Sequence, residues 1–426
     1  MFAPISECYK SEVDFFSTPE TQTSIESNHY SRVNPLTAVT NDSAPIEFLI
    51  NSSSEHFIDP SNIYLYTQFD IEYENGQDFP ENQIVYPETN TLHTLFNSLE
   101  IYLNETKITN GGNNYSYRSF IETVLNHTKY EKKSRLKCQG FYSENERLKE
   151  IEKYSALKKI SFEGYGKLSS EIFHQDKLLL NNCDIKIKLN RNKPEFVIKV
   201  GNDEAILNKR IIVNIKEIYM NIRRVKLTAH QQLSIEKMLN TTVATYPISR
   251  IEVKSFTLTK DISSKMISNI VGGKLPYRII YGLTKHSSYN GLYKESGFCF
   301  NHFNLKSTTV YINGTPHTHN INVKYSDDEN VKSFHTRAYH SLFSELNDNI
   351  DITYEDFKNT YCFYAFDLSQ DRCLNLNDHI NPSKQGELGI HLEFSKPISE
   401  NLTLIIYLEF NNTIQIDKTR QIFIDY

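Results

Sequence analysis

The sequence predicts an all-β protein built from two similar antiparallel β-sandwiches in tandem. Short apolar strands recur along the whole chain, helical patterns are few and short, and one strand–turn–helix pattern occurs in each half. The 426 residues exceed a typical single core and favour two domains of about 180–200 residues each. Strands with long excursions and one short helix per domain fit a jelly roll better than an up-and-down barrel.

The repeated pattern is the strongest sign of duplication. Phe96–Asn104 reads as a strand running into a polar turn, and Val310–Gly314 repeats that pattern in the second half. A helix with one apolar face follows each strand. The faces consist of Tyr117, Phe120, Ile121, Val124 and Leu125 in the first half, and of Tyr339, Leu342, Phe343 and Leu346 in the second. We expect Phe120 and Phe343 to be buried anchors, each in its own half.

Residues 1–40 are polar and lack a sustained period, so we expect an N-terminal arm that is mobile alone and orders against a neighbour. The first jelly roll is expected over residues 41–227. Its predicted strands are Pro45–Ile50, Ile63–Tyr73, Phe96–Asn104, Ile160–Tyr165, Leu178–Leu189, Glu195–Val200 and Arg210–Leu227. Residues 129–160 form a charged excursion with a helical pattern at Asn145–Tyr154.

Residues 228–240 are expected to be a connecting helix that holds the two halves rigidly. Thr228 and Gln231 have the spacing of a capping box at its start. The second jelly roll is expected over residues 241–426. Its predicted strands are Ile248–Leu258, Leu275–Leu283, Thr308–Ile312, Tyr361–Asp367, Leu388–Phe394 and Leu402–Phe410, the last with alternate apolar residues on one face.

Composition narrows the function classes. Aromatic residues make up 12% of the chain without any Trp, and this Tyr-rich make-up suits strands and contact surfaces. A net charge of −6 gives no global attraction to nucleic acid. Neither a signal peptide nor a membrane-spanning apolar run is visible. The six cysteines lack a Cys-x-x-Cys pair and predict free, mostly buried thiols in a reducing compartment.

The chain offers little that predicts catalysis. Gly272-Gly273-Lys274 lacks the rest of a phosphate-binding loop. His317 and His319 could place two imidazoles on one side of a strand, but no third ligand stands at a zinc-site spacing. His174 and Asp176 favour a solvated turn over a site. We therefore predict no catalytic, cofactor-binding or metal-binding residues, no cofactor and no enzymatic activity.

Two stretches of the chain are rich in basic residues. The run of Lys129, Lys132, Lys133, Arg135 and Lys137 is simplest as a solvated loop, and a contact with packaged nucleic acid is the alternative. A second set is interleaved with apolar residues and predicts the polar face of a long strand; it consists of Lys209, Arg210, Lys216, Arg223, Arg224 and Lys226.

A series of stretches, in order and at similar spacing, carries a resemblance to a known family. It includes Pro45–Phe48, Asp59–Tyr66, His93–Leu103, Phe173–Asn181, Arg224–Leu227, Tyr246–Ile248, Leu275-Pro276, Asn290-Gly291, Phe303–Leu305 and Arg337–Tyr339. The series resembles the major capsid proteins of Polinton (Maverick) elements and adintoviruses, from about Pro45 to past Leu346. Residues 1–40 and the last part of the chain match least.

The resemblance implies a double jelly roll, with two eight-stranded sandwiches in one chain. It implies homotrimers of pseudo-hexameric outline that tile an icosahedral virion capsid around double-stranded DNA, assembled inside the host cell. The implied partners are neighbouring capsomers and penton or minor capsid proteins, with neither sequence-specific nucleic-acid binding nor a membrane span. Six similar edges per trimer suit hexagonal lattice positions.

Three alternatives remain at the level of the sequence. A carbohydrate-binding jelly roll shares the sandwich, but it would have an aromatic site with Asp or Asn on end loops and a secretion signal. A cupin-type enzyme needs a His and Glu cluster on barrel strands, and the sequence offers none. A double jelly-roll assembly scaffold has the same sequence pattern as a capsid protein.

Overall fold

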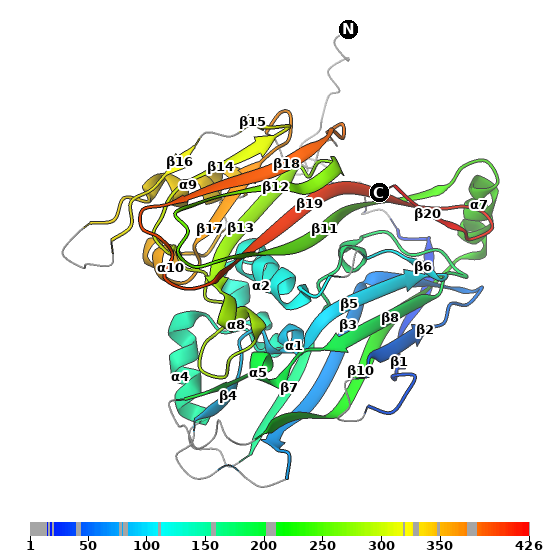
Figure 1. Ribbon diagram of the computed structural model, residues 1–426. Helices are drawn as coiled ribbons and strands as arrows, with labels where there is room; N and C mark the ends of the chain where they lie inside the picture. Colours follow the sequence, from blue (N-terminus) through cyan, green and yellow to red (C-terminus); the bar gives the residue numbers. More distant parts are fainter. Residues whose placement is uncertain are drawn as a thin grey trace.

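The computed structural model describes Phe15, Thr18 and Phe79 together with residues 21–39, 44–75, 84–109, 112–154, 159–201, 210–317, 320–326, 332–346, 350–372 and 381–425. Each half of the chain forms two β-sheets that face each other, and the two sandwiches lie against one another with helix α2 between them (Figure 1). Within a sheet, neighbouring strands are antiparallel.

The first half contains two four-stranded sheets. One has the order β1-β10-β3-β7, and the other has the order β2-β8-β5-β6. The strands are β1 (Ile25–Val33), β2 (Ile46–Ile50), β3 (His56–Tyr73), β5 (Phe96–Leu103), β6 (Thr106–Lys107), β7 (Ile160–Gly166), β8 (Ile185–Arg191) and β10 (Ile211–Leu227). A small additional sheet pairs β4 (Val85–Pro87) with β9 (Ile198–Val200).

The second half contains two five-stranded sheets. One has the order β11-β19-β13-β17 with β20 paired to β19, and the other has the order β12-β18-β14-β15 with β16 paired to β14. The strands are β11 (Ala244–Leu258), β12 (Ser264–Lys274), β13 (Arg278–Lys285), β14 (Leu305–Ile312), β15 (Thr315–Pro316), β16 (Ile321–Asn322), β17 (Phe363–Asp367), β18 (Gln385–Phe394), β19 (Leu402–Ile416) and β20 (Ile422–Ile424).

The two halves have the same topology. When β1, β2, β3, β5, β6, β7, β8 and β10 are matched in chain order with β11, β12, β13, β14, β15, β17, β18 and β19, both sheet orders of the first half become those of the second. Eight strands in two facing sheets with this crossing order form a jelly roll. The predicted double jelly roll is therefore confirmed.

The repeated hairpin has the same chemistry in both halves. Asn104 and Glu105 turn β5 into β6 with positive φ angles of 43° and 71°, and Asn313 and Gly314 turn β14 into β15 with 51° and 75°. Two successive positive φ angles are typical of tight hairpin turns, which Asn and Gly tolerate best. Asn104 Oδ1 accepts the backbone N–H of Asp184 at 2.8 Å, and Asn313 Oδ1 accepts that of Glu387 at 2.8 Å. The duplication thus includes side-chain hydrogen bonds to matching strands.

Short helices fill the excursions between strands. The first half has α1 (Thr91–Thr94), α2 (Tyr115–Asn126), α3 (Lys129–Lys133), η2 (Arg135–Gln139), α4 (Glu144–Tyr154), η3 (Glu171–His174) and α5 (Pro194–Val197). The connector is α7 (Ala229–Leu239), and the second half has α8 (His286–Asn290), α9 (Thr336–Glu345) and α10 (Tyr354–Asn359). Helices α2 and α9 occupy matching places, because each lies between the hairpin and the sixth matched strand, β7 or β17.

Several strands confirm the sequence pattern closely. In β3, the side chains of Ile63, Leu65, Phe69, Ile71 and Tyr73 are buried, and every second residue from Tyr64 to Glu72 is partly exposed. This alternation is expected for a strand with one face on a core.

The expected arm at residues 1–40 needs correction, because Ile25–Val33 forms β1 and pairs along its length with β10. Without this strand the first sandwich would have one strand fewer than the second. The segment shows no apolar alternation because β1 lies at a sheet edge and most of its side chains are exposed. The division of the chain into residues 41–227, 228–240 and 241–426 remains a prediction.

Three smaller expectations also differ. The predicted strand Glu195–Val200 begins with a helical turn, since Pro194 stands at the first position of α5. The predicted strand Leu178–Leu189 is regular only from Ile185. At the connecting helix, Thr228 makes no side-chain capping hydrogen bond, whereas a complete capping box occurs at Thr128 and Glu131, which begins α3.

Candidate functional site

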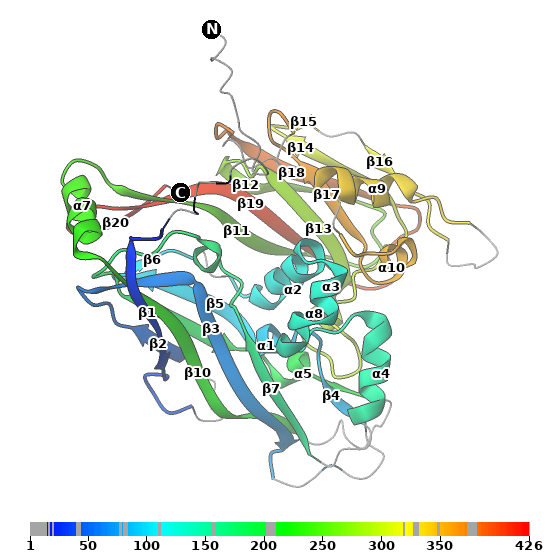
Figure 2. The ribbon, with the colours of Figure 1, turned by 180° about the vertical axis from the view of Figure 1, so that it is seen from behind.

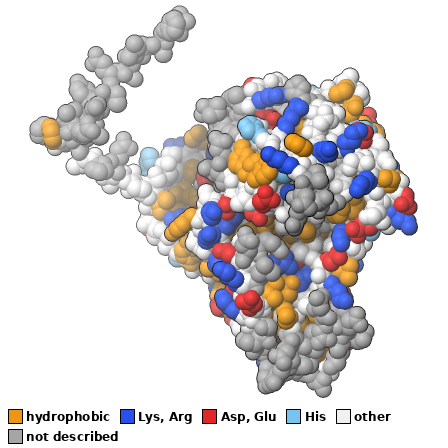
Figure 3. All heavy atoms as spheres, turned by 90° about the vertical axis from the view of Figure 1, so that its left-hand side faces the viewer, with side chains coloured by type: hydrophobic (Ala, Val, Ile, Leu, Met, Phe, Trp, Pro, Cys, Tyr) orange, Lys and Arg blue, Asp and Glu red, His pale blue; other side chains and the backbone are white. Residues whose placement is uncertain are grey.

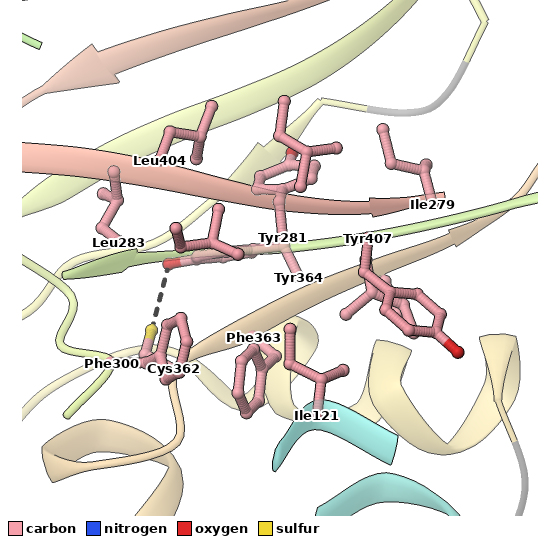
Figure 4. Packing of buried hydrophobic residues seen from close by; sticks show 14 of the residues in the cluster. Ile121, Ile279, Tyr281, Leu283, Phe300, Cys362, Phe363, Tyr364, Leu404 and Tyr407 are labelled. Atoms are coloured by element: carbon pink, nitrogen blue, oxygen red, sulfur yellow. Dashed lines mark hydrogen bonds between the residues drawn. The ribbon is translucent and has the colours of Figure 1, made fainter. Parts of the chain in front are cut away.

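Helix α2 belongs to the first half, but its apolar side is part of the core of the second half. The ring of Phe120 stacks on Phe298 with 4.3 Å between centroids and an angle of 7° between planes. Tyr117 meets the edges of Phe298 and Phe300. Figure 4 shows Ile121 projecting from α2 towards Phe363 in this core. The expectation that Phe120 anchors its own half is therefore wrong, because its stacked neighbours belong to the other half.

The matching helix α9 is less deeply buried. All the residues of α2 from Tyr115 to Leu125 are buried, whereas in α9 only Ala338 and Leu342 are buried. Phe343 packs against the second core but remains partly exposed. Its expected role as a fully buried anchor therefore needs correction. The reason is that α2 has protein on both sides, whereas within this chain α9 lies against one sandwich.

A buried group of charges ties α2 to the second half. Arg118 Nε lies 2.9 Å from Glu122 Oε1, and Arg118 Nη1 lies 3.1 Å from Glu171 Oε1. Tyr407 in β19 donates its hydroxyl to Glu122 Oε1 at 3.3 Å, and the backbone N–H of Ile251 donates to Glu171 Oε1 at 2.8 Å. Burial disfavours charge on Arg118, but Glu171 and Glu122 outweigh it and raise the pKa of Arg118 above its usual value. The hydrogen bonds from Tyr407 and Ile251 to these carboxylates join the two halves and hold them in one relative position.

A cleft of about 980 Å³ lies beside this group and has walls from both halves, including Glu122, Glu171 and Glu409. Glu409 lies 3.3 Å from Arg278 Nη1, and burial raises the pKa of Glu409 despite that arginine. Each of the three carboxylates already has a basic or hydrogen-bonding partner in the chain. The cleft is therefore best explained as the seam between the sandwiches.

A second buried ion group crosses the same seam. Glu88 lies 3.2 Å from Arg147 Nη2 and 3.8 Å from Lys199 Nζ. Lys199 also donates to the backbone carbonyl of Leu292 in the second half at 2.8 Å. Burial lowers the pKa of Lys199 to about 8, against the attraction of Glu88. The sequence pattern predicts neither buried group. The signal that it does contain is the i, i+4 pair of Arg118 and Glu122 on an otherwise apolar helix.

The histidines considered from the sequence do not form a site in the described structure. His174 ends η3 and lines the seam cleft, where burial lowers its pKa, and the neighbouring Gln175 donates to the carbonyl of Pro247 at 2.8 Å. Asp176 is exposed. His317 is exposed, and its partner His319 lies outside the described residues. Within the described part of the chain, no three His, Cys, Asp or Glu side chains gather as metal ligands.

The basic run at residues 129–137 is partly structural. Lys132 is buried and donates to the carbonyl of Val124 at 2.7 Å, and burial lowers its pKa to about 8. Arg135 lies 2.6 Å from Glu131 Oε1, and Lys137 lies 3.5 Å from Glu146 Oε1. Three of its five basic side chains therefore have structural partners. Lys274, from the glycine-containing stretch, lies 3.3 Å from Asp425 Oδ2.

Four of the basic residues on or next to β10 pair with carboxylates, and the consecutive residues Arg223 and Arg224 point to opposite faces of the strand, so the predicted single polar face holds only in part. The partners of these four are on neighbouring strands: Arg210 with Glu74, Lys216 with Asp70, Arg223 with Asp59, and Lys226 with Glu26. Lys209 lies outside the described residues. Of the described cysteines, Cys183 and Cys362 are buried free thiols, but Cys138 and Cys299 are exposed, so the expected burial holds for two of four.

The outer face of the sheet β1-β10-β3-β7 carries a cluster of aromatic side chains that we call the tyrosine face. Its members are Tyr30, Tyr64, Tyr66, Tyr165 and Tyr219, with Tyr30 58% and Tyr165 38% exposed. Ring centroids are 4.5 Å apart between Tyr66 and Tyr219 and 5.2 Å apart between Tyr64 and Tyr165. The guanidinium of Arg32 lies 3.8 Å from the centre of the Tyr219 ring. Stacked Tyr and Arg side chains of this kind are enriched at protein–protein interfaces.

These features define a rigid double jelly-roll chain whose two buried ion groups join its halves. Among the described residues, no helix combines the length and apolarity needed to cross a membrane. No protein-family model matches the sequence. An uncharacterised protein of Caenorhabditis elegans is 24% identical over 434 residues, which cover 96% of this chain and 99% of that protein.

Several solved structures share the fold over almost the whole chain. A chain of the Sputnik virophage matches with a TM-score of 0.66 and 10% identity, covering 99% of this chain and 93% of its own. A chain from the PBCV-1 virus capsid matches with a TM-score of 0.61 and 9% identity, covering 97% and 99%. The mavirus major capsid protein matches with a TM-score of 0.55 and 10% identity, covering 100% and 95%. At 9–10% sequence identity, these matches show that the fold is shared.

Proposed function

We propose that this chain is a major capsid protein that acts by self-association. The observation that carries the proposal is its duplicated jelly roll, joined rigidly by α2 and similar along nearly its full length to chains of virus capsids. Two like sandwiches in a fixed relation give one chain two similar edges, and three chains give six. A closed ring of that kind fits a hexagonal position in a shell.

The finer proposal follows the sequence resemblance to Polinton (Maverick) and adintovirus capsid proteins. In this proposal the chain forms homotrimers of pseudo-hexameric outline that tile an icosahedral virion capsid around double-stranded DNA, and the capsid assembles inside the host cell. Neighbouring capsomers and penton or minor capsid proteins would be its partners. The protein would act without catalysis and without reading a nucleic-acid sequence. Three of the five basic side chains in the run at residues 129–137 have partners within the chain, which leaves fewer of them for a contact with packaged nucleic acid.

The test is the assembly state of the purified full chain. Gel filtration with light scattering should give roughly 150 kDa, three times the chain mass of 49.6 kDa, at micromolar concentration. Electron microscopy of the same sample should show capsomers of hexagonal outline. A stable monomer would contradict the proposal, and a monomer that binds glycans would favour a carbohydrate-binding jelly roll. Trimers that are absent from mature particles would favour an assembly scaffold.

A further inference from the structure

A second cavity lies apart from the seam cleft, between helix α4 of the first half and the segment 284–303 of the second half. Its volume is about 470 Å³, and none of the described residues that line it also lines the cleft. Helices α4 and α8 both contribute to its wall, and they lie near each other on the side of the molecule away from α7 (Figure 2). Cavities of about 300–1,000 Å³ are typical of sites for small molecules.

The wall of this second cavity is largely aromatic. The rings that line it are those of Tyr86, Phe120 and Tyr142 in the first half and of Phe298, Phe303 and Tyr361 in the second, and we call the space the aromatic cavity. A ring that faces a cavity makes fewer dispersion contacts than a ring inside a packed core. A flat aromatic molecule would supply these contacts, because aromatic rings prefer offset-stacked or edge-to-face neighbours.

The charged residues of the aromatic cavity indicate the charge of the molecule that fits. Lys285 Nζ lies 3.0 Å from Glu295 Oε1, and Ser288 donates to Glu295 Oε2 at 2.8 Å. Arg147 Nη2 lies 3.2 Å from Glu88 Oε1. Each of the three charges in the wall therefore has a partner of opposite sign in the chain. An ionic ligand would have to disrupt such a pair, whereas an uncharged ligand leaves all of them intact.

The hydrogen-bonding groups of the wall narrow the class further. Asn301 Oδ1 accepts the backbone N–H of His302 at 2.6 Å, whereas the Nδ2 of Asn301 donates to no described residue. The hydroxyl oxygen of Ser296 accepts the backbone N–H of Phe298 at 3.2 Å, and this hydroxyl also donates to none of the residues that the structure describes. Both groups line the cavity and retain a donor, so they suit a ligand with an acceptor such as a carbonyl oxygen.

The aromatic cavity can be reached from solvent. Cys299 lines it and is exposed, and the side chains of Lys285 and Glu295 are 38% and 41% exposed. Figure 3 views the molecule from the side that bears α4 in Figure 1, and hydrophobic side chains are visible there among charged ones. The thiol of Cys299 can report on the cavity, because the other exposed cysteine of the described residues, Cys138, lines the seam cleft instead.

We propose that the aromatic cavity binds a small, flat and uncharged aromatic molecule that carries a hydrogen-bond acceptor. The ligand lies between α4 and the segment 284–303, with its acceptor at Asn301. Because the walls come from both halves of one chain, the ligand links the two sandwiches, and its binding does not depend on self-association. The inference therefore goes beyond the proposed function.

Nile red is a suitable probe, because it is flat and uncharged, carries a carbonyl oxygen and fluoresces more strongly in apolar surroundings. Titration of the purified full chain with Nile red should give a saturable rise in fluorescence. Alkylation of the cysteines by iodoacetamide, followed by peptide mass spectrometry, then locates the probe. Saturating Nile red should slow the alkylation of Cys299 about tenfold, because the ligand covers this thiol, and should leave that of Cys138 unchanged.

Two variants test the shape and the hydrogen bond. Ile151→Trp on α4 extends a larger side chain into the cavity and should raise the dissociation constant of Nile red about tenfold, while Leu233→Trp on the exposed side of α7 is the matched control and should leave it unchanged. Asn301→Asp keeps the acceptor for His302 but removes the donor, so it should also weaken Nile red about tenfold. Binding of diphenylhexatriene, which is uncharged but has no acceptor, should not change in this variant.

The alkylation rates of the wild type decide the position of the site even where a variant fails to fold, which circular dichroism melting checks. Protection of Cys299 without protection of Cys138 supports the site in a monomer and in a trimer alike. Absence of saturable binding, an unchanged alkylation rate of Cys299, or an equal slowing of Cys138 would overturn the proposal. Wild-type affinity for Nile red in a folded Ile151→Trp variant would overturn it as well, and tighter binding of an anilinonaphthalene sulfonate would overturn the uncharged class.

Discussion

Replacing Phe120 by Ala tests whether the two jelly rolls share one core. The side chain is 1% exposed and stacks on Phe298, so its removal leaves a cavity among rings of the second half. Buried Phe→Ala changes cost about 3–5 kcal/mol, and loss of the stacked pair places this one near the upper end, at about 4–5 kcal/mol. Phe343→Ala on the matching helix is the control. Because Phe343 is partly exposed, we expect it to cost about 1 kcal/mol.

Urea denaturation followed by far-UV circular dichroism measures both free energies, and hydrogen exchange locates the change. Since Phe120 is carried by the first half and packs in the second, protection should fall both in α2 and around Phe298 and Phe300. A loss of protection confined to residues before α7 would refute the shared core. Equal destabilisation by Phe120→Ala and Phe343→Ala would refute the difference in burial between α2 and α9.

Two further predictions concern the first half. Burial lowers the pKa of His93 to about 4 from 6.5, so its stabilising contribution is complete above pH 6.5 and is lost as the pH falls through 4. Urea titrations should therefore show a free energy of unfolding that is about 3 kcal/mol lower at pH 4 than at pH 6.5 because of this group. The variant His93→Gln should remove this difference. If the free energy of unfolding of His93→Gln changes with pH as it does in the wild type, the prediction is contradicted. Gly140 has φ of +75°, and an added Cβ would lie 2.6 Å from Thr91 Oγ1, so Gly140→Ala should cost about 3 kcal/mol. Gly314 has the same φ, but a Cβ added there would meet nothing within 4 Å, so Gly314→Ala should lower the stability by only about 1 kcal/mol in thermal melting. Equal losses of stability in the two glycine variants would refute the steric argument.

The sequence predicts the elements whose burial has a simple period. Alternation reveals β3 because one of its faces is buried, and the i, i+3, i+4 pattern reveals α2 because its apolar side is wide. The Asn turns at Asn104 and Asn313 are also visible, since positive φ angles restrict the residues that fit. Together with the strands that recur along the whole chain, these three features predict the duplication and the fold class.

Other parts depend on neighbours that a sequence pattern does not identify. Strand β1 is formed by pairing with β10, and its exposed polar side chains resemble those of a loop. The sequence pattern does not reveal strand β12 (Ser264–Lys274), because most of its side chains are exposed and its pairing with β18 shifts register between Ile267 and Val271. Apolar alternation in Leu402–Phe410 identifies one buried face, but the burial of Tyr407 on the other face depends on α2, which lies far away in sequence. For the same reason the sequence pattern places Phe120 in the wrong core.

Joining two sandwiches in one chain changes the energetics of the proposed ring. Each body that associates loses translational and rotational freedom, which costs about 4–15 kcal/mol. A ring of three chains requires two such associations, whereas a ring of six separate sandwiches would require five. The contact between the two sandwiches of one chain forms during folding, without an association step. It therefore tolerates buried charges such as Arg118 and Glu122, whose desolvation would weaken a contact between separate chains. The outer face of the sheet β1-β10-β3-β7 must also remain soluble in the free chain. Tyrosine suits such a face, since its ring supplies contact area and its hydroxyl remains hydrated.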